Sequence, residues 1–236
     1  MDKRGAHETG QTMMDIDFSE QRTKMVDCQI RTTDVTDAAI LSAMLAVPRE
    51  AFVPDARINL AYIDENILIS QERGATARYL MQPSPFAKLL QLAEIRSDDR
   101  VLDVGAGTGY SAAILSRLCK SVVALETDTG LADQAASTLA RIGCDNVSVE
   151  KGPLAAGCPA KAPYDVIFVG GSVEELPDTL TEQLAEGGRL VAVEGSGNAG
   201  VARVYLKSNG VVTGRRTFNA AVKPLPGFEG MSKFEF

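Results

Sequence analysis

The 236-residue chain contains one histidine and no tryptophan, and its four cysteines form no C-x-x-C pair. The histidine, His7, lies in a polar N-terminal stretch, so the sequence offers no imidazole-based catalytic triad and no candidate zinc site. We expect Cys28, Cys119, Cys144 and Cys158 to be reduced thiols that pack as small buried hydrophobic residues. The sequence therefore predicts no bound metal and a chemistry that proceeds without histidine.

The chain also lacks long apolar runs and an excess of positive charge. No run approaches the roughly 20 apolar residues that span a bilayer. Lysine and arginine number 24 against 31 acidic residues, a net charge of −7 that gives no long-range attraction to phosphate backbones. The N-terminus lacks the apolar core of a secretory signal. We therefore expect a cytoplasmic protein with no membrane or nucleic-acid partner; the oligomeric state is left open.

The first half of the chain predicts a helical cap in front of a larger domain. A helical pattern runs from residue 19 to about 54, with Asp34 or Thr36 as the cap of a second helix that Pro48 ends. An irregular segment follows and contains one short predicted strand at Ile67–Ser70. We expect residues 1–18 to be a disordered leader, 19–84 the cap and 85–236 an α/β core continuous with it.

The core predicts a Rossmann-like α/β fold. Its short apolar runs predict strands at 101–104, 121–125, 147–150, 166–169 and 190–193. Helices are expected from Pro85 onward and at 110–118, 130–142 and 176–184. This alternation favours a mostly parallel sheet, and Asn209-Gly210 between two β runs predicts an antiparallel hairpin at its C-terminal end.

A glycine-rich stretch, VLDVGAGTGY, follows the first core strand, and its spacing indicates the ligand. The dinucleotide fingerprint G-x-G-x-x-G needs a glycine where this chain has Tyr110. The loop glycines are Gly105, Gly107 and Gly109, and we expect free backbone N–H groups there. Asp103 before the loop would repel a pyrophosphate but suits a ligand that carries an ammonium group.

Glu126 supplies the second half of this prediction. It ends the apolar run SVVAL, and in a doubly wound sheet that position lies beside the glycine loop. A carboxylate there can accept hydrogen bonds from both ribose hydroxyls. Glycine loop, Asp103 and Glu126 together describe a pocket for S-adenosylmethionine, with S-adenosylhomocysteine as product, in a class I methyltransferase fold. An NAD-type or unassigned Rossmann-like sheet is the alternative.

Most of the chain, from about Gln21 to the hairpin, resembles the protein-L-isoaspartate O-methyltransferases. The resemblance rests on the blocks RTKMVDCQIRTTDVTDAAILSAMLAVPREAFVP, AYIDENILI, VLDVGAGTGYSAAILSRL and APYDVIFVGGSVEELPDTLTEQLAEGGRLV. It implies a repair enzyme that methylates the free carboxyl of isoaspartyl residues in damaged proteins. That carboxylate is ionised at neutral pH, so no general base is required and the rate comes from alignment.

Two positions depart from the family pattern. Met81 stands where the family's I-S-x-P block has its serine, and Ser84 or Thr76 is the hydroxyl that could replace it. Gly152 is followed by Pro153 where the family has an acid that reaches the adenine amino group. The candidate catalytic residues are Ser84 and Gln82. The candidate cofactor-binding residues are Asp103, Gly105, Ala106, Gly107, Thr108, Gly109, Tyr110, Glu126, Thr127 and Gly152.

Two hypotheses of function remain at this stage. The first is an active carboxyl methyltransferase for isoaspartate or a related acid. The second is a catalytically altered relative that binds the cofactor or a protein partner without isoaspartyl methylation. Met81 and Pro153 favour the second, whereas the glycine loop and Glu126 favour the first. A dehydrogenase is a distant third.

Overall fold

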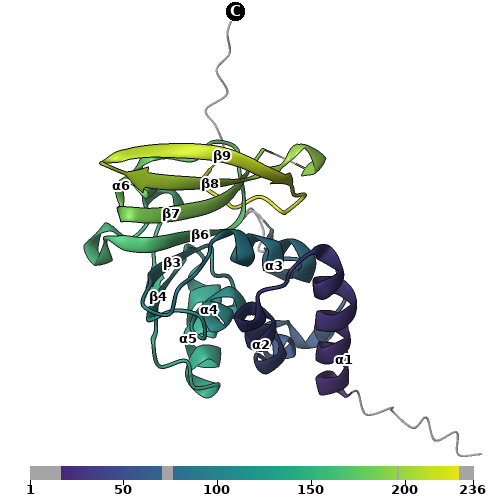
Figure 1. Cartoon of the computed structure of the whole chain (residues 1–236). Helices are drawn as coiled ribbons and strands as arrows, with labels where there is room; N and C mark the ends of the chain where they lie inside the picture. The colour runs from purple at the N-terminus through teal and green to yellow at the C-terminus, as the bar shows by residue number, and fades with distance from the viewer. Residues whose placement is uncertain (1–16, 71–76, 196, 229–236) are drawn as a thin grey trace, which may run out of the picture.

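A seven-stranded sheet forms the centre of the molecule (Figure 1). The computed structural model describes residues 17–70, 77–195 and 197–228. The sheet order is β5-β4-β3-β6-β7-β8-β9, parallel from β5 to β7 and antiparallel at β8 and β9. Its strands are β3 (Arg100–Val104), β4 (Ser121–Glu126), β5 (Val147–Lys151), β6 (Tyr164–Val173), β7 (Leu184–Glu194), β8 (Val201–Ser208) and β9 (Val211–Asn219). The predicted fold class is confirmed.

The C-terminal hairpin follows the turn that its sequence predicts. Asn209 and Gly210 both have positive φ, 52° and 75°, which a two-residue type I′ turn requires. Ser208 and Val211 pair on either side of the turn, and β8 and β9 continue the pairing. The Asn-Gly signal therefore locates the hairpin correctly.

The core helices lie near their predicted positions, but two of them are shorter. They are α3 (Pro83–Leu92), α4 (Tyr110–Leu115), α5 (Thr129–Arg141) and α6 (Asp178–Glu182). The helix predicted at 176–184 begins only after Pro177, because the residue before a proline disfavours the helical conformation. The helix ends at Glu182, because Leu184 already belongs to β7, where it pairs with Tyr164 of β6.

The N-terminal cap is helical, as predicted, with a different capping residue. Its elements are α1 (Phe18–Met25), a π turn (Val26–Ile30), a 3-10 turn (Arg31–Thr33) and α2 (Ala38–Ala46). Asp37 caps α2 by accepting hydrogen bonds from the N–H groups of Ala39 and Ile40 at 2.8 and 3.1 Å. The prediction of Asp34 or Thr36 is wrong, because Asp34 has a left-handed backbone and ends the preceding turn. Residues 1–16 of the predicted leader lie outside the described residues.

The second half of the cap contains a short hairpin that lies over the carboxyl ends of β3 and β4. It consists of β1 (Ile67–Ser70), the predicted strand, and β2 (Arg78–Leu80), which pairs antiparallel with it. Two 3-10 turns, Arg49–Phe52 and Asp55–Leu60, precede it. Further 3-10 turns cover Leu154–Ala156, Pro159–Lys161 and Gly197–Ala199.

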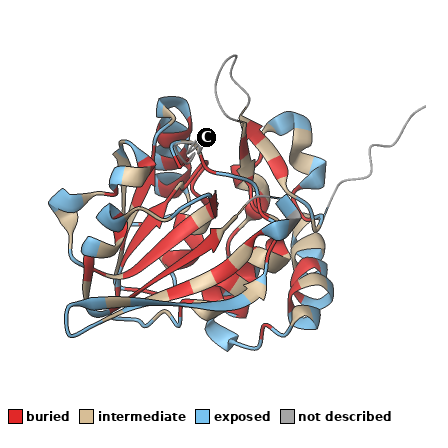
Figure 2. Cartoon of the chain, turned by 90° about the horizontal axis from the view of Figure 1, so that it is seen from above, coloured by how far each residue is buried: buried red, intermediate tan, exposed pale blue. Residues whose placement is uncertain are grey.

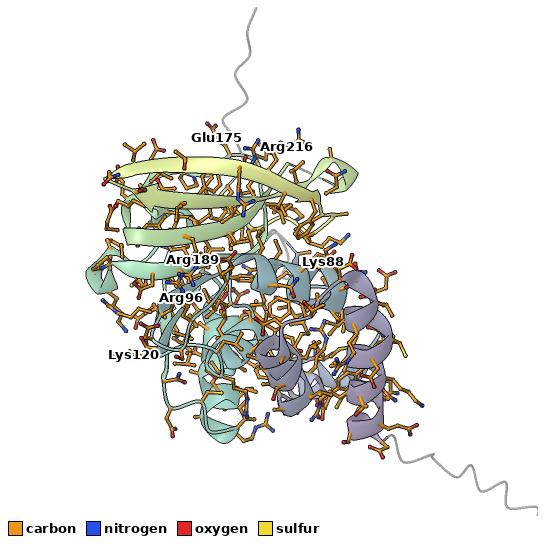
Figure 3. All side chains as sticks on the ribbon, in the orientation of Figure 1. Lys88, Arg96, Lys120, Glu175, Arg189 and Arg216 are labelled. Carbon is orange, nitrogen blue, oxygen red and sulfur yellow. The ribbon has the colours of Figure 1, made fainter. Side chains whose placement is uncertain are left out.

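Buried residues follow the central strands and the helix faces that cover them (Figure 2). The larger apolar cluster joins α1 to α5 with one face of the sheet, and the smaller covers the other face beside α6. The Arg189 guanidinium, labelled near Arg96 in Figure 3, bonds the Asp99 carboxylate at 2.6 Å and fastens β7 to the turn before β3. In the described ranges, no helix is both long and apolar enough to cross a membrane.

The cysteines correct one expectation. All four are free, but only Cys119 and Cys144 are buried. Cys28 is exposed and Cys158 is partly exposed. Cys28 lies in the π turn between α1 and α2, whose outer face meets solvent, so its position on the cap overrides the general preference of cysteine for the interior.

Candidate functional site

The candidate site lies at the carboxyl ends of β3, β4 and β6. Strand order reverses at this point, since β3 lies between β4 and β6, and open parallel sheets bind ligands at such a switch. The glycine loop joins β3 to α4 here. Gly105, Gly107 and Gly109 have φ of 83°, 57° and 97°, a left-handed conformation that favours glycine. The backbone therefore explains all three glycines.

Hydrogen bonds within the protein already engage much of the loop. The N–H groups of Gly105 and Ala106 donate to the Leu125 carbonyl, at 2.9 and 3.1 Å. The N–H of Gly107 donates to Glu126 at 2.7 Å, and that of Gly109 to the Ala106 carbonyl at 2.9 Å. The expectation of free N–H groups is wrong for these four residues, because three of the N–H groups donate to the end of β4 and that of Gly109 closes a turn within the loop.

Side chains of the chain itself approach the loop closely. A Cβ added at Gly107 would lie 2.8 Å from Ile69 Cδ1 of β1. One added at Gly105 would lie 2.7 Å from Leu225 Cδ2, in the segment that follows β9. The glycines therefore make room for the hairpin and the C-terminal segment, which cover the loop from two sides.

Asp103 is a buried carboxylate with an unused oxygen. It is the last residue but one of β3, next to the loop, and is 0% exposed. Its Oδ2 accepts a hydrogen bond from the Ser111 hydroxyl at 2.6 Å, whereas Oδ1 has no partner among the described residues. Burial, helped by the charge of Glu126, raises the pKa of Asp103 to about 7, against the opposing effects of Ser111 and Arg78. A perturbed acid at a switch point is typical of a functional site.

Glu126 is equally buried but fully bonded. It ends β4 and is 0% exposed. The Arg78 guanidinium of β2 binds it through both oxygens, with N···O distances of 2.9 and 2.8 Å. Backbone N–H groups of Gly107, Thr127 and Asp128 also donate to it, at 2.7 to 3.0 Å. Glu126 thus lies where its spacing predicts, beside the loop, and a cation from the hairpin covers it.

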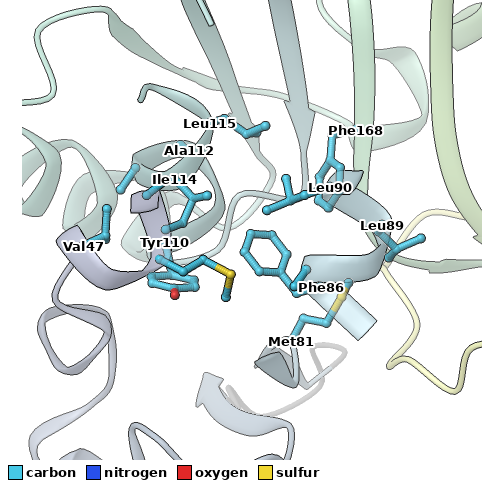
Figure 4. Close-up of a cluster of buried hydrophobic side chains, with 14 of the residues drawn as sticks. Val47, Met81, Phe86, Leu89, Leu90, Tyr110, Ala112, Ile114, Leu115 and Phe168 are labelled. Atoms are coloured by element: carbon cyan, nitrogen blue, oxygen red, sulfur yellow. The ribbon is translucent and has the colours of Figure 1, made fainter. Parts of the chain in front are cut away.

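A pocket lies between the loop, the hairpin and α3. Its lining includes Gly107, Ser111, Met81 and Gly170. Phe86 and Tyr110 form one wall with ring centroids 5.6 Å apart, in the cluster that Figure 4 shows with Met81 and Phe168. The pocket is therefore apolar on one side and bounded by the backbone of the glycine loop on the other.

Arg49 holds the start of α3 against this pocket. It is 0% exposed and donates hydrogen bonds to the carbonyls of Met81 and Ala61 at 2.8 and 2.7 Å. Its guanidinium lies 4.8 Å from the centre of the Tyr110 ring, and burial lowers its pKa. The block VPREAFVP thus supplies the arginine that holds the Met81 backbone in place.

The remaining predicted residues have varied places. Thr108 is buried and donates through its hydroxyl to the Phe52 carbonyl at 2.7 Å, so that side chain holds the cap against the loop. Thr127 is exposed beside Glu126, and the Gly152 N–H donates to the Glu126 carbonyl oxygen at 3.1 Å. The loop residues, Asp103, Glu126, Thr127 and Gly152 therefore converge at one edge of the sheet.

The two candidate catalytic residues lie at the start of α3. The backbone N–H of Gln82 donates to Asn66 and that of Ser84 to Asp64, each at 3.2 Å. Neither is among the residues that line the pocket described above, whereas Met81 is. Thr76, the other possible hydroxyl, lies outside the described residues. The catalytic roles of Ser84 and Gln82 stay predictions.

Sequence reasoning missed Arg78 and Ser111. Ser111 lies in the first turn of α4, eight residues after Asp103, and a polar residue at that offset in an apolar helix is a usable signal. Arg78 is a lone cation in a short strand next to the block with Met81. Its partner lies 48 residues further along, so only the folded chain reveals the pair.

Comparisons with known proteins agree with this geometry. The family model for protein-L-isoaspartate(D-aspartate) O-methyltransferase (PCMT) matches residues 20–227. Protein-L-isoaspartate O-methyltransferase 1 of Rhodopseudomonas palustris (strain HaA2) is 40% identical over 215 residues, 90% of this chain and 86% of that protein. The corresponding protein of Koribacter versatilis is 37% identical and covers 91% of this chain and 95% of its own length.

Solved structures give the same result. One protein-L-isoaspartate O-methyltransferase superposes with a TM-score of 0.76 at 28% identity, over 88% of this chain and 67% of its own. A Plasmodium falciparum structure described as a protein-L-isoaspartate O-methyltransferase in complex with S-adenosyl-L-homocysteine has a TM-score of 0.73 at 22% identity, over 89% of this chain and 98% of its own. The latter supports the fold alone. By its family model and its relatives, the chain belongs to the protein-L-isoaspartate(D-aspartate) O-methyltransferase family.

Proposed function

We propose that the protein transfers a methyl group from S-adenosylmethionine to the free carboxylate of isoaspartyl residues in damaged proteins. Membership of the family supports this reaction. The observation that carries it is Oδ1 of Asp103, a carboxyl oxygen that is buried at the glycine loop and has no partner among the described residues. A buried polar atom without a partner is rare in native structures and calls for an explanation, which a cationic ligand supplies.

The residues present fit this cofactor. The free oxygen of Asp103 suits the ammonium group of its methionyl part, because a charge-assisted hydrogen bond would offset the cost of burying the acid. Glu126 has the right chemistry for two ribose hydroxyls, although Arg78 covers it in this conformation. The residues proposed to hold the cofactor are Asp103, Gly105, Ala106, Gly107, Thr108, Gly109, Tyr110, Glu126, Thr127 and Gly152.

The chain's own contribution to the reaction is alignment. When bound, the cofactor supplies an electrophilic methyl group on a sulfonium. An acceptor carboxylate with a pKa near ~4 is already ionised at neutral pH, so the protein does not have to remove a proton. The apolar wall of Phe86, Met81 and Phe168 excludes water from one side of the pocket. Holding the reacting groups in line near contact distance then provides the rate.

The residues at the start of α3 and after β5 determine how the acceptor and the cofactor are held. We propose Ser84 and Gln82, at the start of α3, as the polar residues that orient the acceptor. Met81 brings a thioether where the family pattern has a hydroxyl. Pro153 is exposed after β5 and supplies neither a carboxylate nor an N–H. The adenine end of the cofactor therefore has fewer polar contacts than the family pattern implies.

Methyl transfer to peptides tests the proposal. The purified chain is incubated with S-adenosylmethionine carrying a labelled methyl group and with an isoaspartyl peptide, and base-labile ester is measured. The matched control is the same peptide with normal aspartate. We expect ester on the isoaspartyl peptide only. Equal labelling of both peptides would contradict the substrate assignment, and no labelling of either would contradict the activity.

The amino-acid composition is the basis for what we propose about the protein's cellular location and partners. We propose a cytoplasmic enzyme without a nucleic-acid or membrane partner, supported by the net charge of −7. Isoaspartyl proteins or peptides, or a related carboxylate, are its proposed partners.

A further inference from the structure

Arg78 occupies the carboxylate to which the cofactor's ribose is assigned. Five donors converge on Glu126: two from the Arg78 guanidinium and three from backbone N–H groups. A carboxylate offers about four lone-pair sites. Glu126 in this conformation therefore has no capacity left for a ribose hydroxyl, and one set of donors must leave before the hydroxyls can bind.

The donor set that can leave is the guanidinium. The three N–H groups belong to Gly107, Thr127 and Asp128, which the loop and the end of β4 fix in place. Arg78 reaches Glu126 from β2, through a side chain with several rotatable bonds. Its remaining bond, from Nη2 to the Gly105 carbonyl, is long at 3.3 Å. Ribose and Arg78 are therefore alternative partners of one carboxylate.

A second pocket adjoins the first and contains the same guanidinium. Arg78 lines it together with Asn66, Lys223 and Pro224, and it shares Tyr79, Met81 and Gly170 with the first pocket. The Lys223 ammonium lies 5.2 Å from the centre of the Tyr79 ring. Lys223 is exposed, whereas Arg78 is 4% exposed. Two cationic side chains thus border a pocket that adjoins Met81, and such a pocket favours a carboxylate.

The charge of Arg78 connects the two pockets, because its guanidinium needs an anionic partner wherever it lies. A buried guanidinium that loses its counter-ion is strongly destabilised. When the ribose takes Glu126, Arg78 needs another anion, and the pocket that it already lines is where an acceptor carboxylate would meet it. One oxygen of that carboxylate can contact the guanidinium while the other remains available for methyl transfer.

We propose that Arg78 is the acceptor-binding residue of this enzyme, held on Glu126 until the cofactor's ribose displaces it toward the acceptor's carboxylate. The inference rests on the proposed function and names how the same site recognises its second substrate. It makes the two ligands cooperative, because each favours the conformation that the other needs. Thermodynamic linkage requires the effect to be reciprocal.

Calorimetry tests the coupling without turnover. S-adenosylhomocysteine and an isoaspartyl peptide are titrated alone and in each other's presence into the parent, Arg78→Met and the control Arg100→Met. Arg100 begins β3, at the far end of the strand from Asp103. In the parent and the control, we expect each ligand to tighten the other at least tenfold. In Arg78→Met, S-adenosylhomocysteine alone should bind at least tenfold more tightly than in the parent, and the coupling should vanish.

The variants should keep their fold, since Glu126 retains three backbone donors after Arg78→Met. Arg78→Lys serves as a second variant if Arg78→Met does not fold. Because one ammonium cannot contact both oxygens of Glu126 as the guanidinium does, Arg78→Lys should change both affinities in the same direction as Arg78→Met, but by less. Lys223→Met should weaken the peptide several-fold and leave S-adenosylhomocysteine unchanged.

Two results would overturn the inference while the proposed function stands. One is equal affinity for S-adenosylhomocysteine in the parent and Arg78→Met; the other is peptide binding in the parent that ignores S-adenosylhomocysteine. Absence of S-adenosylhomocysteine binding in both proteins would contradict the cofactor assignment itself, and with it the inference. If Arg78→Met binds S-adenosylhomocysteine and the parent does not, the result would support the inference, because Arg78 would then block the cofactor site completely.

Discussion

Two buried carboxylates lie at the carboxyl ends of neighbouring strands of the sheet, and they are bonded in opposite ways. Asp103 of β3 and Glu126 of β4 are both 0% exposed and flank the same glycine loop. One oxygen of Asp103 has no partner among the described residues, whereas Glu126 accepts from five donors. Glu126 therefore has a cationic partner within the protein, namely Arg78, whereas Asp103 has none and can accept one from a ligand.

The largest effect is expected from removing the charge of Glu126. Glu126→Gln leaves the guanidinium of Arg78 buried without a counter-ion, which costs about 3–5 kcal/mol of unfolding free energy. Denaturant unfolding at pH 7 measures this loss, with Asp133→Asn as the control because Asp133 pairs with Lys151 at the exposed surface. A loss below about 1 kcal/mol, the typical value of an exposed pair, would show that Arg78 does not depend on Glu126.

Asp103→Asn is expected to have the next largest effect, and it depends on pH. Folding raises the pKa of Asp103 from 3.8 to about 7. The folded state therefore holds a proton that the unfolded state loses, so this stability is complete below pH 4 and lost as the pH rises through 7. The variant does not titrate, and between pH 4 and pH 8 it should gain roughly 2–4 kcal/mol of unfolding free energy relative to the parent.

Chemical unfolding of the parent and Asp103→Asn at pH 4 and at pH 8 measures that gain in stability. The same carboxylate should bind the cofactor's ammonium better when ionised, so the parent's affinity for S-adenosylhomocysteine should rise as the pH passes 7. Asp103→Asn should bind S-adenosylhomocysteine weakly at both pH 6 and pH 8. A parent whose affinity is the same at pH 6 and pH 8 would remove Asp103 from the cofactor site.

The smallest effect is expected at Met81, which lines both pockets. Met81→Ser adds the hydroxyl of the family pattern, and one hydrogen bond to a charged group is worth about 1.5–3 kcal/mol, roughly ten- to a hundredfold in rate. Ester formation on an isoaspartyl peptide should rise by that factor at unchanged S-adenosylhomocysteine affinity. No rise in rate for Met81→Ser, together with a loss of rate for Ser84→Ala, would contradict this prediction and show that Ser84 orients the acceptor without help from a hydroxyl at position 81.

Local patterns in the sequence predict most of the fold. The apolar runs place β3, β4 and β5 within a residue or two, and Asn209-Gly210 places the final turn. Asp103 and Glu126 also follow from spacing, because a doubly wound sheet brings the carboxyl ends of adjacent parallel strands together. The sequence does not single out the cap of α2, because three candidate side chains lie within four residues; in the folded chain Asp37 has the extended backbone of a cap and accepts the N–H bonds of the first turn.

The bonding of the site could not be predicted in this way. Arg78 reaches Glu126 because the β1-β2 hairpin folds over the glycine loop, a contact between distant parts of the chain. The loop's N–H groups are likewise engaged by Leu125 and Glu126, which the glycine spacing does not indicate. Strand spacing therefore predicts which acids meet, and tertiary packing decides which of them already has a partner.

A crystal structure of the protein with S-adenosylhomocysteine would show directly which groups the two carboxylates bind. We expect the ligand's ammonium within hydrogen-bond distance of Asp103, its ribose hydroxyls on Glu126, and the Arg78 guanidinium withdrawn from that carboxylate. A complex in which Arg78 keeps both contacts with Glu126, or in which the ammonium lies away from Asp103, would contradict this expectation.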